Sequence, residues 1–222
     1  MSSSYRYYTF ISSLFVALLM LSNTVATKLI SIGPFIVSGG IIVFPLTYIF
    51  GDVLTEVYGY KQSRKIIWTG FFVLLLMSLV YWLVGILPPA MGWLNQTAYN
   101  TILGLVPRIA LASLIAYWLG EFSNSFVLAK MKLLTQGRHL WMRTIGSTIV
   151  GEGIDSTVFV ILAFYGVFPN NLLLPAILSG YILKVVYEII ATPLTYRIVK
   201  FLKRAEGVDA YDYTTKFNPF HF

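Results

Sequence analysis

The chain has 222 residues, of which 57% are hydrophobic and 11% are charged. Because an ordinary soluble domain carries roughly 25% charged residues, this composition excludes a soluble globular protein and predicts a single membrane domain. The chain has no cysteine, which excludes disulfides, thiolate catalysis and cysteine metal sites.

Six apolar segments follow one another along the chain. The first lacks a small-residue cleavage site, so we expect a retained helix rather than a signal peptide. The clearest segment is residues 66–87, which contains no charge and is longer than the roughly 20 residues that a membrane span needs. It follows Arg64 and Lys65 and ends at two prolines. The expected transmembrane helices comprise residues 10–30, 37–58, 64–87, 103–129, 143–166 and 172–200.

The connections between these segments differ in charge. The glycine-rich segment 31–40 is expected to turn the chain between the first two helices, and Pro45 to kink the second. Thirteen of the 16 basic residues lie at the N-terminus, in the connections near residues 61–65 and 130–143, or from residue 197 onward. The positive-inside rule then predicts cytoplasmic termini and an even number of crossings.

We therefore expect an all-α fold, a polytopic bundle of six transmembrane helices formed by residues 1–204. Residues 205–222 carry both signs of charge and are too irregular for a seventh helix, so we expect a cytoplasmic tail. The net charge of +7 would suit nucleic acid only if the basic residues lined one face, and their spacing follows membrane topology instead. No nucleic-acid partner is expected.

Apart from the basic residues assigned to the cytoplasmic ends, nine charged residues fall inside the expected helices. An ionised side chain at mid-membrane costs about 2.5 to 3.5 kcal/mol, so these residues must face inward, pair with one another or become neutral. The cations are Lys28, Arg108 and Lys184. The acids are Asp52, Glu56, Glu121, Glu152, Asp155 and Glu188.

The spacing of these charges predicts polar stripes on three helices. Asp52 and Glu56 are four residues apart, and so are Lys184 and Glu188, while Glu152 and Asp155 are three apart, so each pair shares a helix face. Ion pairs that hold the bundle together are one explanation. However, three cations cannot neutralise six acids, and a surplus acid must bind a proton or an external donor. A ligand rich in N–H groups would satisfy it.

Several of these residues lie within longer motifs. The first and second expected helices contain SNTVATK, which ends at Lys28, and FPLTYIFGDVLTEVYG, which begins at Phe44. The later helices contain RIALAS from Arg108, GEGIDSTVF from Gly151, and YILKVVYE around Lys184. In this order and spacing, the motifs resemble the queuosine precursor transporter family, also called the vitamin uptake transporter family. The resemblance covers nearly the whole chain.

The resemblance implies uptake of 7-cyano- or 7-aminomethyl-7-deazaguanine across a bacterial inner membrane, for salvage into modified tRNA. It carries a set of pocket residues over to this chain, while the glutamates at positions 56, 152 and 188 match some family members only. The residues carried over are Asn23, Asp52, Arg108, Asp155 and Lys184.

The chemistry of the residues is compatible with such a ligand. A guanine-like edge offers adjacent N–H donors that Asp155 or Glu152 would accept, and its carbonyl would accept from a cation or amide. The candidate donors are Lys184, Arg108 and Asn23. Aromatic stacking adds roughly 1 to 3 kcal/mol per base in single-strand binding proteins. The candidate stacking residues are Phe44, Tyr48 and Phe159. Asp52 or Glu188 would pair with the ammonium of an aminomethyl ligand.

Functions other than transport fit the sequence less well. The two histidines lie outside the expected helices, and neither GEGIDS nor FGDVLT matches the GxGD pattern of intramembrane aspartyl proteases, so no enzyme, metal site or cofactor is expected. The chain has no phosphate-binding GxxxxGK[ST] loop. It would therefore be an ion-driven carrier or a binding subunit with an ATP-driven partner. The sequence also allows another vitamin or nucleobase as the ligand, and it does not determine the oligomeric state.

Overall fold

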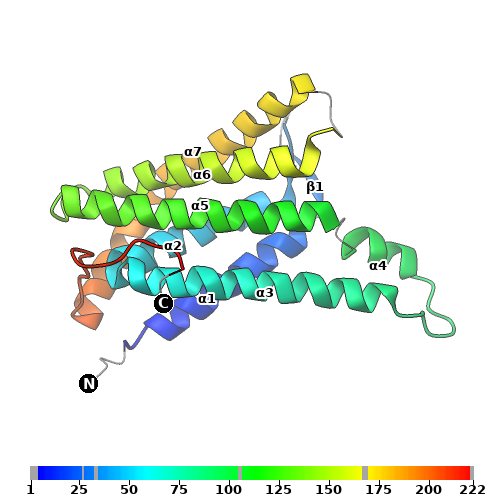
Figure 1. Cartoon of the computed structure of the whole chain (residues 1–222), viewed down its shortest axis with the longest axis horizontal. Coiled ribbons are helices and arrows are strands. Elements are labelled where there is room, and N and C mark those ends of the chain that lie inside the picture. Colours follow the sequence, from blue (N-terminus) through cyan, green and yellow to red (C-terminus); the bar gives the residue numbers. More distant parts are fainter. Residues whose placement is uncertain (1–4, 27, 33–34, 105–106, 167–169, 221–222) are drawn as a thin grey trace.

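A computed structural model describes residues 5–26, 28–32, 35–104, 107–166 and 170–220, and this part of the chain is largely helical (Figure 1). The helices are α1 Tyr8–Val25, α2 Phe44–Tyr58, α3 Tyr60–Ile86, α4 Gln96–Ile102, α5 Pro107–Leu134, α6 Leu140–Phe164 and α7 Asn170–Glu206. A small antiparallel hairpin of β1 Leu29–Ile32 and β2 Phe35–Ser38 precedes a 3-10 helix, η1 Gly39–Ile42.

Four helices in the described part, α1, α3, α6 and α7, are long and apolar enough to cross a membrane. Their outward faces carry large apolar side chains, such as Phe72 and Leu76 on α3, as expected for surfaces that contact lipid. Helix α5 has 28 residues but is less apolar, because it carries Glu121, Asn124 and several serines. Helix α2 has 15 residues, which is short for a span. The count of six crossings therefore stays a prediction.

The region between the first two helices differs from the sequence prediction. Helix α1 ends at Val25 rather than at residue 30, and the expected turn contains the β-hairpin. The strands LISI and FIVS are rich in β-branched residues, a strand signal that the helix prediction overlooked. Pro45 lies in the first turn of α2, where it starts the helix instead of kinking it. Helix α4 was not predicted.

Helix α2 is the centre of the bundle. It contacts α1, α3, α5 and α7, and 12 of its 15 residues are buried. A single residue, Gly59, joins it to α3; its φ of +83° is accessible to glycine at no steric cost. Because α2 is enclosed on several sides, its polar side chains face protein rather than lipid.

Helices α5 and α6 approach closely along their length, and small residues allow this. A Cβ atom on Gly151 would lie 2.7 Å from the Asn124 Cβ atom and 3.0 Å from the Gly120 carbonyl oxygen. Any larger residue there would force the two helices apart. Close approach through small residues is common between membrane helices.

The tail after α7 is irregular, as predicted, and it packs along the ends of α2 and α3 (Figure 1). Arg64 donates to the carbonyl oxygens of Lys216 and Asn218, at 2.8 Å each. Trp68 Nε1 donates to the Pro219 carbonyl at 2.9 Å. These bonds hold the tail against one end of the bundle.

Substitution of Gly151 by alanine should destabilise the protein, because the new methyl group overlaps α5. Overpacking of this kind costs about 1 to 3 kcal/mol. Thermal unfolding of the purified protein in detergent would show a lower midpoint for Gly151→Ala. The matched control is Gly180→Ala, whose Cβ would meet nothing within 4 Å. Equal midpoints for the two variants would contradict the tight α5–α6 contact.

Candidate functional site

Polar side chains from four helices meet beside α2. Phe44, Tyr48, Asp52 and Glu56 recur every fourth residue of α2 and so share one face. This face meets charged or amide side chains of α5, α6 and α7. The sequence spacing had predicted this polar stripe on α2.

Lys184 of α7 joins the acids of α6. Its Nζ atom lies 2.7 Å from Glu152 Oε2 and 2.7 Å from Asp155 Oδ2. The same ammonium lies over the Phe44 ring, 4.3 Å from its centroid, which is a cation–π contact. One cation thus serves two carboxylates, and the group keeps a net negative charge when all three are ionised.

Three further buried acids have no cation partner in the described part of the chain. Asp52 Oδ1 accepts from Asn124 Nδ2 at 2.6 Å, while its other oxygen and both carboxylate oxygens of Glu121 and Glu188 find no hydrogen bond among the described residues. All three side chains are almost fully buried. Burial of a bare carboxylate is costly, so each group must bind a proton or meet a donor from outside the chain.

These acids form one neighbourhood. Glu188 lies close enough to Asp52 for the two carboxyls to repel each other. Glu121 is repelled in the same way by Glu152 and Asp155 of α6. The close packing of α5 against α2 and α6 also places Tyr48 near these acids. A Cβ atom on Gly120 would lie 2.9 Å from the Tyr48 hydroxyl and 2.8 Å from the Asp155 Cβ atom. The Tyr48 hydroxyl is buried and also lacks a described partner.

The remaining predicted site residues are placed differently. Asn23 of α1 donates to the Leu19 carbonyl at 2.9 Å and accepts from Ser113 of α5 at 3.4 Å, so its described contacts join α1 to α5. Phe159 follows Asp155 by one turn of α6 and is half-buried. Arg108 belongs to the first turn of α5, and its side chain lies outside the described residues.

Two residues of this neighbourhood, Glu121 and Asn124, were absent from the predicted site. The sequence placed Glu121 only among the acids inside the expected helices, and the structure buries it against Gly51 of α2. Asn124 follows it by three residues, on the same face of α5. This spacing of three residues was the sequence signal that could have placed Glu121 and Asn124 together in the site.

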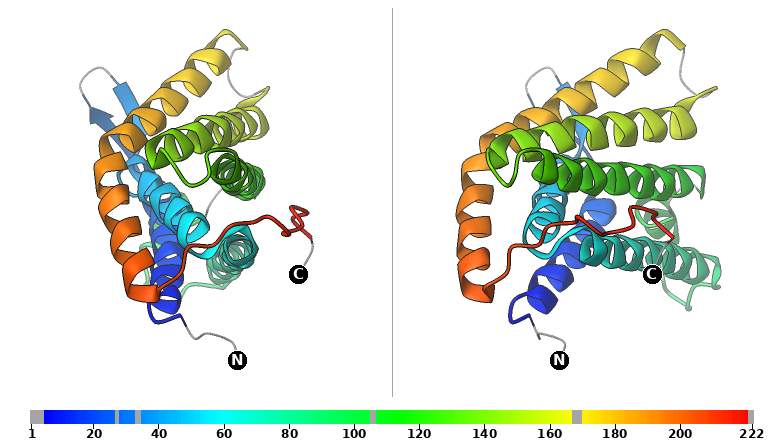
Figure 2. Two further views of the ribbon diagram at one scale, coloured as in Figure 1. Left: turned by 90° about the vertical axis from the view of Figure 1, so that its left-hand side faces the viewer. Right: turned by 60° about the vertical axis from the view of Figure 1, so that its left-hand side comes forward.

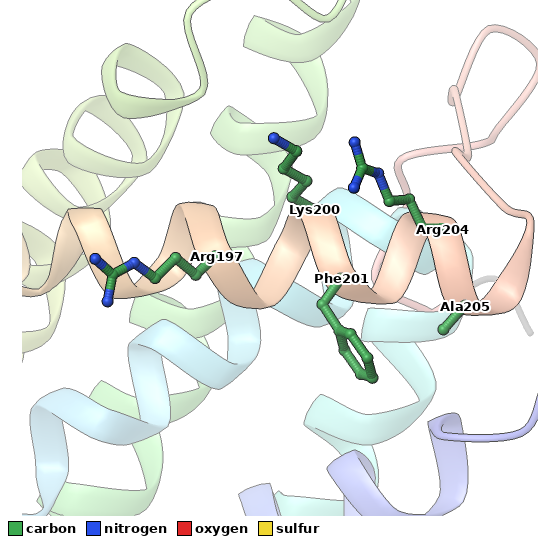
Figure 3. A pocket seen from close by; sticks show the side chains of 5 residues that line it. All are labelled: Arg197, Lys200, Phe201, Arg204 and Ala205. Carbon is green, nitrogen blue, oxygen red and sulfur yellow. The ribbon is translucent and has the colours of Figure 1, made fainter.

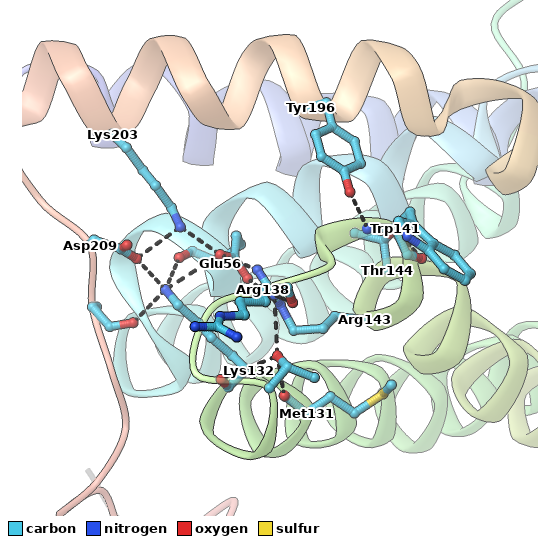
Figure 4. A network of polar contacts seen from close by, with 12 residues as sticks. Glu56, Met131, Lys132, Arg138, Trp141, Arg143, Thr144, Tyr196, Lys203 and Asp209 are labelled. Carbon is cyan, nitrogen blue, oxygen red and sulfur yellow. Dashed lines mark hydrogen bonds and ion pairs between the residues drawn. The ribbon is translucent and has the colours of Figure 1, made fainter.

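Glu56 belongs to a second, fully paired cluster at one end of the bundle (Figure 4). Arg143 donates to both of its carboxylate oxygens, at 2.8 and 3.2 Å. Lys203 reaches the same carboxylate at 2.6 Å and Lys132 at 3.5 Å. The sequence argument that set three cations against six acids was therefore wrong for Glu56, because long side chains near the ends of α5, α6 and α7 neutralise it. Lys28, counted among the helix cations, is exposed beyond the end of α1.

The tail completes this second cluster. Asp209 lies 2.5 Å from Lys132 Nζ and 2.8 Å from Lys203 Nζ. Partial burial would raise the pKa of Asp209, but the hydrogen bonds and charges of these two lysines outweigh it and hold the pKa below its usual value. The cluster ties the ends of α2, α5, α6 and α7 to the tail, so its role is structural.

Two surface hollows lie away from both clusters. One, of about 510 Å³, lies on the last turns of α7 (Figure 3), and the other, of about 370 Å³, lies between α1 and α3. Within the described ranges, no group of three His, Asp or Glu side chains is arranged to hold a metal ion.

Loss of the Glu56 charge should unfold the protein more easily, because Arg143, Lys132 and Lys203 would lose their shared anion. Breaking a buried ion pair costs about 3 to 5 kcal/mol. Thermal unfolding should show a large drop for Glu56→Gln. The control Asp209→Asn removes an acid of the same cluster whose side chain is 43% exposed, and its drop should be smaller. A drop as large for Asp209→Asn would argue against this division of roles.

Comparison with known proteins confirms the resemblance stated from the motifs. A family model described as "Putative vitamin uptake transporter" matches residues 38–198. The chain is 33% identical to the "Probable queuosine precursor transporter" of Bacillus subtilis (strain 168), over 75% of this chain and 73% of that protein. It is 29% identical to the "Queuosine precursor transporter" of Escherichia coli (strain K12), over 69% and 67% of the two chains. No solved structure matches. The chain belongs to the vitamin uptake transporter family, whose model covers most of its length.

Proposed function

We propose that this protein takes up 7-deazaguanine precursors of queuosine, 7-cyano- or 7-aminomethyl-7-deazaguanine, across a bacterial inner membrane. The family and the names of its relatives support transport of such a compound. The observation that carries the ligand class is the group of buried carboxyls at Asp52, Glu121 and Glu188, which lack partners in the described chain. A ligand with several N–H donors satisfies these groups.

The chemistry of the site matches the two faces of the ligand. The N–H edge of a guanine-like ring binds a carboxylate in bidentate fashion, and Asp155 or Glu152 takes this role once Lys184 turns to the ring carbonyl. Phe44, beneath Lys184, offers a ring for stacking. Lys184 thus holds the two acids together until a ligand with its own donors replaces it.

We assign the other predicted residues to the same pocket as part of this proposal. Tyr48 lies beside Asp155 of α6, and Glu188 lies near Asp52 of α2. Asn23 and Arg108 belong to the pocket on the motif match, and Phe159 as a candidate stacking residue. The side chains of Asn23 and Phe159 would reach the ligand from α1 and α6.

We also propose six crossings, made by α1, α3, α5, α6, α7 and by α2 together with η1, with both termini in the cytoplasm. The basic Glu56 cluster and the tail lie at the same end of the bundle, in agreement with the positive-inside rule. Residues 1–204 then form the transport domain and residues 205–222 its cytoplasmic tail. The surplus carboxyls are suitable proton sites for coupling to a gradient.

Uptake of labelled 7-deazaguanines by cells that lack their own transporter tests this proposal. Lys184→Ala and Asp155→Asn should each lose uptake, because removal of one buried charged partner costs about 2 to 5 kcal/mol, which is more than tenfold. Lys61→Gln, at an exposed position, is the matched control and should keep normal uptake. Normal uptake by both site variants, present in the membrane in wild-type amounts, would overturn the assignment.

The surplus acids should matter most for the ligand that carries a positive charge. Asp52→Asn and Glu188→Gln should reduce uptake of the aminomethyl compound more than uptake of the cyano compound, because the ammonium needs an anionic partner. Competition between the two compounds in the same cells measures this ratio. An unchanged ratio in both variants would remove these acids from ammonium recognition. A proton uncoupler, added in parallel, tests gradient coupling.

A further inference from the structure

Helix α7 is longer than a membrane crossing requires. Its 37 residues have a length of about 55 Å along the helix axis at 1.5 Å per residue, whereas the hydrocarbon core is about 30 Å thick. A considerable part of the helix must therefore lie outside the core. The last turn carries Lys203 and Arg204, which belong in water or among headgroups.

The helix changes direction before it ends. Figure 2 shows α7 as two straight parts that meet at a bend, with the second, orange part lying along the edge of the bundle. Pro193 lies inside the helix, and proline is the commonest cause of such a bend. We call residues 193–206, from this proline to the end of α7, the terminal segment.

The terminal segment has two different sides. Thr195, Val199 and Leu202 are buried against the bundle. The opposite side is exposed and carries Arg197, Lys200, Phe201 and Arg204, which recur at intervals of three and four residues. An amphipathic helix with cations and an aromatic residue on its outer face is typical of segments that lie in the membrane interface.

This outer face is hollowed. A shallow, open groove of about 510 Å³ on the surface of α7 is lined by Arg197, Lys200, Phe201, Arg204 and Ala205 (Figure 3). Within the described part of the chain, none of its three cations forms an ion pair, whereas the neighbouring Lys203 turns inward to Glu56 and Asp209. The groove thus presents three positive charges without an anion of the protein's own.

We propose that this groove binds the phosphate of an anionic phospholipid headgroup. Arginine forks bind phosphate in bidentate fashion, and basic residues beside a membrane attract anionic lipids. Phe201 is 56% exposed and Leu194, on the same side, 50%. These apolar groups favour a lipid over a soluble phosphate, because acyl chains would cover them. Headgroup binding anchors the terminal segment at the interface, independently of any transported substrate.

Native mass spectrometry of the detergent-solubilised full chain tests this inference. The measurement is the affinity for phosphatidylglycerol relative to phosphatidylcholine with the same acyl chains. The wild type should prefer phosphatidylglycerol, and the triple variant R197Q/K200Q/R204Q should lose about tenfold or more of that preference. The matched control, K61Q/K65Q/K216Q, removes the same number of positive charges from exposed positions elsewhere and should keep it.

Three results would overturn the proposal. Equal wild-type affinity for the two lipids would exclude headgroup recognition. Equal loss in both triple variants would indicate an effect of net charge alone. Displacement of phosphatidylglycerol by soluble glycerol phosphate at similar concentration would identify a phosphate site rather than a lipid site. If the triple variant fails to fold, the double variants R197Q/R204Q and K61Q/K65Q carry the same comparison. Loss of uptake plays no part in these readouts, so failure of the proposed function stays distinguishable.

Discussion

A carboxylate inside a bilayer must find a partner, and this requirement organises the whole bundle. Helix α2 places acids at its middle and at its end, and the protein treats the two positions differently. At the end, Glu56 is surrounded by Arg143, Lys203 and Lys132. At the middle, Asp52 has one amide donor, and its neighbours Glu121 and Glu188 have no described partner. Full pairing at Glu56 holds the helix ends together. Incomplete pairing at the middle of α2 leaves carboxyl groups that a ligand or proton can satisfy.

Close helix packing is what allows the acids to gather. Gly51, Gly120 and Gly151 leave room for the Glu121 carboxyl, for Tyr48 and for Asn124, respectively, where a larger residue would keep the helices apart. The same glycines reduce the distance between α2, α5 and α6, so groups that are far apart in sequence share one low-dielectric environment. In such an environment each unmet hydrogen bond is expensive, which makes the arrangement selective for ligands that supply all the missing donors.

The two ends of the polar stripe therefore suit different tasks. Lys184 is held by two carboxylates and a ring. In the function that we propose, a flat, donor-rich ligand replaces these contacts. The Glu56 cluster instead connects four helix ends and the tail, and its cations are satisfied by the protein itself. A carrier needs a binding site whose contacts can rearrange, and it needs a framework that stays intact during that rearrangement. The bent end of α7 adds a third element, in contact with the membrane surface.

The sequence by itself determined the class of the protein, the positions of most helices and the polar face of α2, because composition and helical periodicity are local properties. It also named Asp155 and Lys184 as site candidates, because both belong to motifs that agree with the family in order and spacing. Only the tertiary structure decided which cation meets which acid. Lys132, Arg143 and Lys203 reach Glu56 through long side chains from other helices, and Glu121 joins the central acids because α5 packs against Gly51. Such contacts depend on how closely helices approach, which no spacing along one chain segment specifies.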